Sequence, residues 1–335
     1  MNKTLVCYHR DMDGWASAFA FWKKYKLDKK FAEAHGEVEY VSVQYGEPFP
    51  KEASDYTHIY VLDFTFDRAI CDELAAVVKL KVIDHHESKF KDLEGADYAV
   101  LDASMSGAEL TWKTVYGMPI PEVIKYVGDY DLHTFLLPNS REITSYLRFL
   151  DWDFETWDNI DMGVALDVGT LLWAQVRSEA KFLAKRSMLV EYLGISTRIF
   201  DAPIQYNEAA TQVYENEVLP FVTFFRYDGD KWLVGLRGNQ GWNLTKLANV
   251  FGGNGHRNAS GFTLTGNFNP TLMANALLST FHALYVARTS GRQARQFAEA
   301  QLMPMGMFTL APYVEPGAVT DEDFPPTDET GEGVV

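Results

Sequence analysis

The sequence is short of cysteine, of long apolar runs and of basic residues. Only two cysteines, Cys7 and Cys71, occur in 335 residues, and they form no CxxC pair. This pattern excludes a disulfide framework and a zinc ribbon. No apolar run reaches the ~18 residues of a membrane-spanning helix, and charge follows the first apolar stretch too soon for a signal peptide. We therefore expect a cytoplasmic protein without a membrane partner.

Acidic residues outnumber basic ones, 46 to 30, which gives a formal net charge of −16. Proteins that grip long duplexes take much of their affinity from Lys and Arg on phosphates, so this class is disfavoured. A short anionic substrate is still compatible, because bound divalent cations reverse the local sign of charge. Apolar residues make up 47% of the chain, enough for sizeable cores, and the length predicts about two domains of roughly 100–200 residues.

The first half of the chain alternates short apolar runs with amphipathic segments. This alternation predicts a parallel α/β sheet with both faces covered, which we assign to residues 1–160. The expected strands are 4–8, 38–43, 58–62 and 80–83, and the expected helices are 14–26, 67–78, 105–116 and 121–128.

The second half predicts a smaller α+β domain over residues 196–290, joined to the first by a linker helix within residues 161–195. The helical pattern itself runs over 163–193. Expected strands lie at 197–205, 221–227 and 231–236, with an Asp-Gly turn between the last two, and a helix is expected near 270–288.

Residues 291–335 are expected to form a C-terminal extension. From about residue 316 the composition is Pro, Gly, Thr and acids, with one aromatic and no basic residue. Such a stretch buries too little apolar surface to order itself, so we expect a disordered acidic tail that keeps the chain in solution or contacts a basic partner.

Metal-binding residue types follow three of the expected strands: His9, Asp11 and Asp13, then Asp63, then Asp84, His85 and His86. Ligands bind outside the carboxyl ends of strands in open α/β sheets, so we expect these side chains to converge. Mixed imidazole and carboxylate ligands suit Mn²⁺, whereas all-oxygen sites suit Mg²⁺. A central carboxylate can bridge two ions about 4 Å apart, which acidify a water and stabilise a phosphoryl group under attack.

Each cluster alone has an ordinary explanation. An Asp at a strand end is commonly a turn former, and Asp13-Gly14 before a helix fits a helix cap. Three clusters of ligand types within about 80 residues favour a metal site over these explanations.

These motifs resemble those of the DHH phosphoesterase superfamily, in the family's order. They are His9-x-Asp11-x-Asp13-Gly14, the isolated Asp63, Asp84-His85-His86, Gly128-Asp129-Tyr130-Asp131, and a loop over 252–261 similar to the glycine-rich loop of DHHA1 domains, with Asn254 in place of one glycine. The resemblance covers about residues 1–290 and is nearest to the oligoribonuclease and nano-RNase (NrnB-like) branch. It implies an N-terminal parallel-sheet DHH domain joined by a long helix to a smaller α+β DHHA1 domain.

The resemblance also implies roles. One divalent ion would be held by His9, Asp11 and Asp63, and the other by Asp13, Asp63, His85 and Asp129, with Mn²⁺ preferred over Mg²⁺. Asp131 is the other candidate in the fourth motif. Asp84 would orient His85, and His86 would face the phosphate, so that Asp63, Asp84 and His86 form the catalytic group.

Substrate binding in the second domain is expected at the glycine-rich loop. Gly252, Gly253 and Gly255 let backbone N–H groups approach an anion closely. His256 would add a donor, and Arg237 a bidentate phosphate contact. The alternatives are a sheet turn for the loop and an ordinary surface arginine at 237.

The function that the resemblance implies is a two-metal phosphodiesterase, a phosphoric ester hydrolase acting on short RNA or DNA oligonucleotides or small nucleotides. A RecJ-like single-strand exonuclease, a pyrophosphatase or polyphosphatase, and a non-catalytic nucleotide-binding module are the alternatives. A homodimer is compatible with the sequence.

Overall fold

The computed structural model describes residues 2–117, 119–238, 241–313, 315–317 and 319–324. The chain divides into two compact units, Met1–Ala174 and Gln175–Val335, so the division falls inside helix α8 (Met162–Arg186). Over the described residues, no helix combines the length and the apolar character needed to cross a membrane.

The first unit is built on a five-stranded sheet in the order β2-β1-β3-β4-β5, in which every neighbouring pair is parallel. Its strands are β1 (Lys3–His9), β2 (Glu37–Val43), β3 (His58–Leu62), β4 (Lys79–Asp84) and β5 (Ala99–Leu101). The four strands expected from the sequence are confirmed as β1 to β4. Only the short β5 was not expected.

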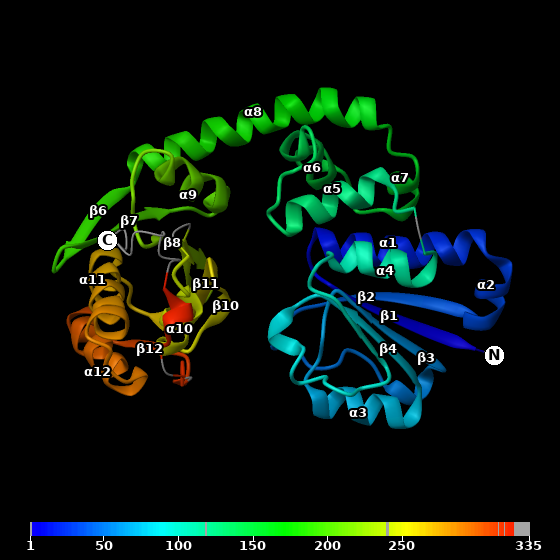
Figure 1. Cartoon of the computed structure of the whole chain (residues 1–335), viewed down its shortest axis with the longest axis horizontal. Helices are drawn as coiled ribbons and strands as arrows, with labels where there is room; N and C mark the ends of the chain where they lie inside the picture. The colour runs from blue at the N-terminus through cyan, green and yellow to red at the C-terminus, as the bar shows by residue number, and fades with distance from the viewer. Residues whose placement is uncertain (1, 118, 239–240, 314, 318, 325–335) are drawn as a thin grey trace. The chain divides into compact units, whose positions relative to one another are not determined.

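Helices cover both faces of this sheet. In Figure 1, α1 and α4 lie on one face and α3 on the other. The first-unit helices are α1 (Met12–Leu27), α2 (Lys29–His35), α3 (Arg68–Val77), α4 (Gly107–Val115), α5 (Glu122–Asp131), α6 (Ser140–Phe149) and α7 (Phe154–Asp158).

The middle of strand β1 is continuously apolar because its alternate residues enter two different cores. Val6 of β1 packs with Phe21 of α1 and Leu110 of α4. Its neighbours Leu5 and Cys7 belong to a second core on the other face, together with residues of α3. A strand buried on both faces has this continuous apolar character.

The second unit contains a mixed seven-stranded sheet in the order β10-β11-β9-β8-β7-β6, with β12 paired to β11. Its strands are β6 (Met188–Tyr192), β7 (Ile195–Asp201), β8 (Val222–Asp228), β9 (Lys231–Arg237), β10 (Asn254–His256), β11 (Ala259–Gly266) and β12 (Phe308–Leu310). Its helices are α9 (Tyr206–Tyr214), α10 (Leu244–Val250), α11 (Pro270–Phe281) and α12 (Gly291–Leu302). The expected α+β character is confirmed, as is the turn that joins β8 to β9 through the pair Asp228 and Lys231.

The long helix ends earlier than its sequence pattern. We expected it to run to residue 193, but α8 ends at Arg186 and the next residues form strand β6. Leu193 and Gly194 both have positive φ, 51° and 78°, in the two-residue turn that pairs β6 with β7. Such turns match the twist of a hairpin. The pairing with β7 therefore overrides the helical propensity of residues 188–193.

The acidic tail also differs from the expectation. We expected disorder from about residue 316, yet Val319 and Phe324 pack against the core of the second unit. Asp323 is only 4% exposed. Val319, the ring of Phe324 and the paired carboxylate of Asp323 anchor this segment. Residues 325–335 lie outside the described residues.

Candidate metal centre

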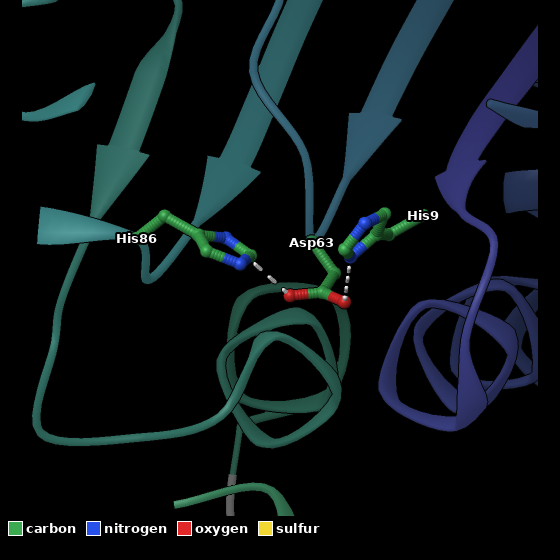
Figure 2. Close-up of side chains that lie close together, drawn as sticks. All are labelled: His9, Asp63 and His86. Carbon is green, nitrogen blue, oxygen red and sulfur yellow. Dashed lines mark ion pairs between the residues drawn. The ribbon is translucent and has the colours of Figure 1, made fainter. Parts of the chain in front are cut away.

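The three strand ends of the first unit bring their polar side chains together. His9 is the last residue of β1, Asp63 follows β3, and His85 and His86 follow β4. Strands β1, β3 and β4 are parallel neighbours, so their carboxyl ends meet at one edge of the sheet. Figure 2 shows His9 and His86 on either side of Asp63.

Asp63 occupies the middle of the cluster. Its Oδ2 lies 3.6 Å from Nδ1 of His9, and its Oδ1 lies 3.2 Å from Nε2 of His85. The ligand atoms form two groups, each lying within 4.8 Å: one of His9, Asp63 and His86, and one of Asp13, Asp63 and His85. Asp63 is therefore shared by both groups.

The backbone at Asp63 is unusual as well. Asp63 has φ of 54°, a left-handed conformation that non-glycine residues seldom adopt. Its side chain is 1% exposed, and no described group donates a hydrogen bond to its Oδ1. Strained backbone of this kind costs on the order of 1–3 kcal/mol and clusters at functional sites.

Asp11 and Asp13 take their positions from the start of helix α1. Asp11 caps the helix, because its Oδ1 accepts from the backbone N–H of Gly14 at 2.9 Å. Its other oxygen faces Nδ1 of His9 at 2.8 Å. A helix cap is thus present, but at Asp11 and not at Asp13 as the ordinary explanation had it. The cap uses only one oxygen of Asp11 and leaves the second directed at the cluster.

Asp13 is buried and anchored by another helix. Its carboxylate accepts from the backbone N–H groups of Gly107 at 2.6 Å and Ala108 at 3.1 Å, at the start of α4. A helix N-terminus favours a negative charge. This contact holds Asp13 within 3.9 Å of Nε2 of His85.

Gln44 determines which nitrogen of His9 carries the proton. The backbone N–H of Tyr45 donates to Oε1 of Gln44 at 2.9 Å, which fixes that atom as an acceptor. Nε2 of His9 lies 3.1 Å from the same oxygen, so it is the nitrogen that donates. Nδ1 of a neutral His9 is then a lone pair facing Asp11 and Asp63.

The cluster holds more negative charge than its own residues can balance. Burial and the neighbouring Asp13 raise the pKa of Asp63 well above its ordinary value. Burial, followed by the charges of Asp13 and Asp63, does the same to the pKa of Asp131. Burial acts to lower the pKa of His9, but the carboxylates of Asp11 and Asp63 that face its ring outweigh it and raise that pKa to about 11. The site therefore favours positive charge at its centre.

The residues present fit divalent metal ions. Oδ1 of Asp63 and Nδ1 of His9 are buried atoms without a hydrogen-bond partner among the described residues. Both are metal-ligand atoms, and mixed imidazole and carboxylate donors suit Mn²⁺ or a similar ion.

Asp84 contacts the ring of His86 rather than that of His85, which corrects the sequence interpretation. Oδ1 of Asp84 accepts from Nδ1 of His86 at 2.7 Å and from the backbone N–H of His85 at 2.8 Å. Its other oxygen accepts from the hydroxyl of Thr65 at 2.6 Å. The ring that Asp84 orients is therefore that of His86, which was expected to face the phosphate but lies in one group of potential ligands with His9 and Asp63.

The fourth motif is also corrected, because Asp131 rather than Asp129 lies in the cluster. Asp131 Oδ2 is 3.4 Å from Nε2 of His85. Asp129 instead accepts from the hydroxyl of Thr134 at 2.6 Å and from the backbone N–H of Leu136 at 2.7 Å. These contacts hold the loop after α5, where His133, Phe135 and Asn139 all have positive φ.

Two residues of the site were not found from the sequence. A Cβ at Gly107 would lie 2.5 Å from Cβ and Oδ1 of Asp63, so only glycine lets α4 approach the cluster. Gln44 directly follows β2, the neighbour of β1 on its other side. The expectation that site residues follow the carboxyl ends of strands would have found Gln44 if it had been applied to β2. In the sequence, Gly107 is marked only by its place after Ser106, the residue that caps α4.

In the second unit, the glycine-rich loop contains a tight hairpin. Strand β10 pairs with β11. A Cβ at Gly253 would lie 2.1 Å from the carbonyl oxygen of Gly261, and one at Gly255 would lie 2.6 Å from that of Ala259. Gly252 has φ of 80° and would meet the carbonyl of Pro312 at 2.6 Å. Close backbone packing thus accounts for these glycines. The side chain of His256 lies outside the described residues.

Arg237 is packed inside the second unit. Its Nε donates to Oδ1 of Asn207 at 2.6 Å, and its guanidinium lies over the rings of Tyr206 and Phe224 at 5.2 and 5.1 Å. Burial lowers its pKa. The surface-arginine alternative is therefore wrong, and the contacts described are structural.

Comparison with known proteins gives the fold. No protein-family model matches the sequence. An uncharacterized protein of Acanthamoeba polyphaga mimivirus is 23% identical over 288 residues, which cover 78% of this chain and 68% of that protein.

Two solved structures are similar over most of the chain. A DHH domain described as a member of the s1p family of ribosomal proteins has 16% identity and a TM-score of 0.54, covering 78% of this chain and 82% of that one. An exopolyphosphatase-related protein from Bacteroides fragilis has 15% identity and a TM-score of 0.51, covering 90% and 93%. The chain has a DHH-type fold. The fold that the motifs implied is thereby confirmed, and in this DHH-type fold the residues of the first three motifs lie at the carboxyl edge of the parallel sheet.

Proposed function

We propose that this chain belongs to the DHH superfamily and is a metal-dependent phosphodiesterase that hydrolyses short oligonucleotides or small nucleotides. The observation that carries the proposal is the place of Asp63, which is common to both ligand groups. A shared carboxylate is the feature that distinguishes a two-ion site from two separate sites. Two ions bound there would acidify a water and stabilise the charge of a phosphoryl group under in-line attack.

The side chains divide the work between them. His9, Asp11, Asp63 and His86 surround one position, and Asp13, Asp63, His85 and Asp131 the other. We propose that these sets hold the ions. Gln44 orients His9 through Nε2, the ring nitrogen opposite the one that faces Asp11 and Asp63. Asp84 holds His86 through Nδ1, which also lies 4.0 Å from Oδ1 of Asp63. Such partners fix the tautomer and the orientation of a metal-bound imidazole.

The net charge of the chain supports a short substrate. A net charge of −16 leaves few cations to bind a long polyanion. Binding energy then comes mainly from the groups next to the ions, and a longer chain gains little more. We propose oligomers of roughly two to five nucleotides as the preferred substrates, since orientation of a short substrate can supply several kcal/mol.

A panel of substrates tests the proposal. The full-length chain with Mn²⁺ is given dinucleotides, 30-nucleotide single strands, cyclic dinucleotides, pyrophosphate and polyphosphate. We expect the highest kcat/KM on the shortest linear phosphodiesters. Equal rates on 30-mers would favour the RecJ-like alternative, and activity confined to the phosphoanhydrides would favour the pyrophosphatase or polyphosphatase alternative. No hydrolysis of any member would support the non-catalytic alternative.

The glycine-rich loop is proposed as a second anchor for the substrate. His256→Ala should then reduce activity on dinucleotides more than activity on a small chromogenic phosphodiester. Equal losses on both substrates would show that His256 is structural.

A further inference from the structure

The last described residues of the chain fill a site of their own in the second unit. Asp323 and Phe324 are neighbours in the sequence. Residues at the start of helix α10 contact Asp323, and a residue in the turn between β10 and β11 contacts Phe324. Asp323 is 4% exposed, although it belongs to an acidic segment that composition alone would leave in solvent. Glu322, directly before it, is exposed.

The carboxylate of Asp323 is held as an anion. Its oxygens accept from Nδ2 of Asn243 at 2.7 Å and from the backbone N–H of Thr320 at 2.8 Å, and Nζ of Lys246 lies 3.2 Å away. Burial acts to raise the pKa of Asp323, but these partners outweigh it and lower that pKa below its ordinary value. Charge-assisted donors of this kind also bind phosphate oxygens.

The ring of Phe324 lies among aromatic and guanidinium groups on which a nucleobase could also stack. Its centroid is 5.2 Å from that of Trp242 and 6.0 Å from that of Tyr285. The guanidinium of Arg288 lies over the ring, 4.2 Å from its centroid. Aromatic and guanidinium surfaces are the groups on which nucleobases stack.

A third cation completes the site. Nη2 of Arg257 donates to the carbonyl oxygen of Phe324 at 2.9 Å. Arg257 itself is in the turn between β10 and β11, and its carbonyl accepts from the backbone N–H of Leu244. Three cations, Lys246, Arg257 and Arg288, therefore converge on one carboxylate, one carbonyl and one aromatic ring. The remainder of the chain is strongly acidic.

We propose that this site binds a mononucleotide and that Asp323 and Phe324 occupy it as a built-in competitor. The carboxylate takes the place of the phosphate, and the phenyl ring takes the place of the base. A nucleotide binds only when the segment leaves, so its apparent affinity is reduced by the fraction of molecules in which the site is filled. The choice of a nucleotide as ligand rests on the proposed function.

The experiment measures binding of 5′-AMP to the full-length chain by calorimetry in EDTA, so that the metal centre takes no part. The Asp323→Asn, Phe324→Ala double variant should bind 5′-AMP at least about tenfold more tightly than the wild type, because the competitor no longer holds the site. Glu322→Ala is the matched control, an acidic residue of the same segment that is exposed, and should bind as the wild type does. Addition of Arg257→Gln to the double variant should abolish the gain.

The single variant Asp323→Asn tests the proposal even if the double variant does not fold, because it removes the charge and keeps the ring of Phe324. Thermal melting shows whether each variant is folded. The single variant should bind 5′-AMP more tightly than the wild type but less tightly than the double variant. Unchanged 5′-AMP affinity in a folded Asp323→Asn or double variant would overturn the proposal and make the segment simple packing. That result would leave the phosphodiesterase proposal standing, because metal-dependent hydrolysis is measured separately.

Discussion

Gln44 and His9 are joined by a hydrogen bond that directs Nδ1 of the imidazole toward the acidic cluster. The 3.1 Å contact between Nε2 of His9 and Oε1 of Gln44 shows that Nε2 carries the proton, because the N–H of Tyr45 donates to Oε1 and identifies it as an acceptor. The pair lies at the ends of adjacent strands β1 and β2. A residue outside both groups of potential ligands thus determines how His9 presents its lone pair.

Loss of this acceptor should weaken metal binding. Gln44→Met keeps the length of the side chain but cannot accept the proton of His9, so the ring is free to turn. We expect the affinity for Mn²⁺, measured by calorimetry, to fall about 10- to 100-fold. Gln44→Glu keeps an acceptor and should lose less. Equal affinity in the wild type and Gln44→Met would show that the contact does not orient His9.

Substitution of the two aspartates of the fourth motif should affect two different properties, metal affinity for Asp131 and the stability of the fold for Asp129. Asp131→Asn removes a charge beside His85 and should reduce the affinity for Mn²⁺ by about 10- to 100-fold, with little change in melting temperature. Asp129→Asn weakens the bonds to Thr134 and Leu136 and should lower the free energy of unfolding by roughly 1.5–3 kcal/mol.

Urea denaturation and Mn²⁺ calorimetry on both variants check this pair. The assignment fails if Asp129→Asn loses the metal while the free energy of unfolding is unchanged and Asp131→Asn binds it normally.

Gly107 should not tolerate alanine, although helix propensity favours the change. Alanine at the first turn of α4 would ordinarily be neutral or stabilising. Its Cβ would lie 2.5 Å from Asp63, so either the helix or the carboxylate has to move. We expect a clear loss of Mn²⁺-dependent turnover.

Gly163→Ala is the matched control for that change, because Gly163 lies in the first turn of α8 and its Cβ would meet only the carboxylate of Asp161, at 3.1 Å. Comparable activity in the two alanine variants would contradict the close approach of α4 to Asp63.

Metal binding should release protons. Burial first, and then neighbouring charges, raise the pKa values of Asp63 and Asp131, so these groups hold protons above the ordinary range of an aspartate when no cation is present. A divalent ion displaces those protons, and its affinity should rise with pH until the raised pKa values are passed. Calorimetry in two buffers of different ionisation enthalpy measures the release. Zero release and a pH-independent affinity would count against the cluster as the metal site.

The sequence predicted the site well where a residue's place follows from the end of a strand. His9, Asp63, His85 and His86 come together because parallel neighbours end at one edge, which apolar runs reveal. The choice between Asp129 and Asp131 was wrong because it depends on which carboxylate the loop after α5 captures. Gly107 was missed because its close approach to Asp63 joins residues far apart in the chain.

In the second unit, too, features set by local sequence were predicted and features set by contacts between segments were not. Its β-rich character and the β8–β9 turn follow from local pattern, whereas the conversion of residues 188–192 into strand β6 depends on pairing with β7. The docking of the C-terminal segment depends on two apolar side chains, Val319 and Phe324, in an otherwise polar stretch. Composition describes the average of such a segment and does not reveal individual anchoring residues.

The most direct test of the account is a Mn²⁺ titration of the wild type and of Asp63→Asn, with turnover of a chromogenic phosphodiester measured on the same samples. The shared carboxylate predicts about two ions bound per wild-type chain, and no turnover in excess EDTA. Asp63→Asn should weaken both sites together and abolish turnover, because one side chain serves both groups. Wild-type stoichiometry with near-normal turnover in Asp63→Asn, or full activity in EDTA, would contradict the two-ion centre.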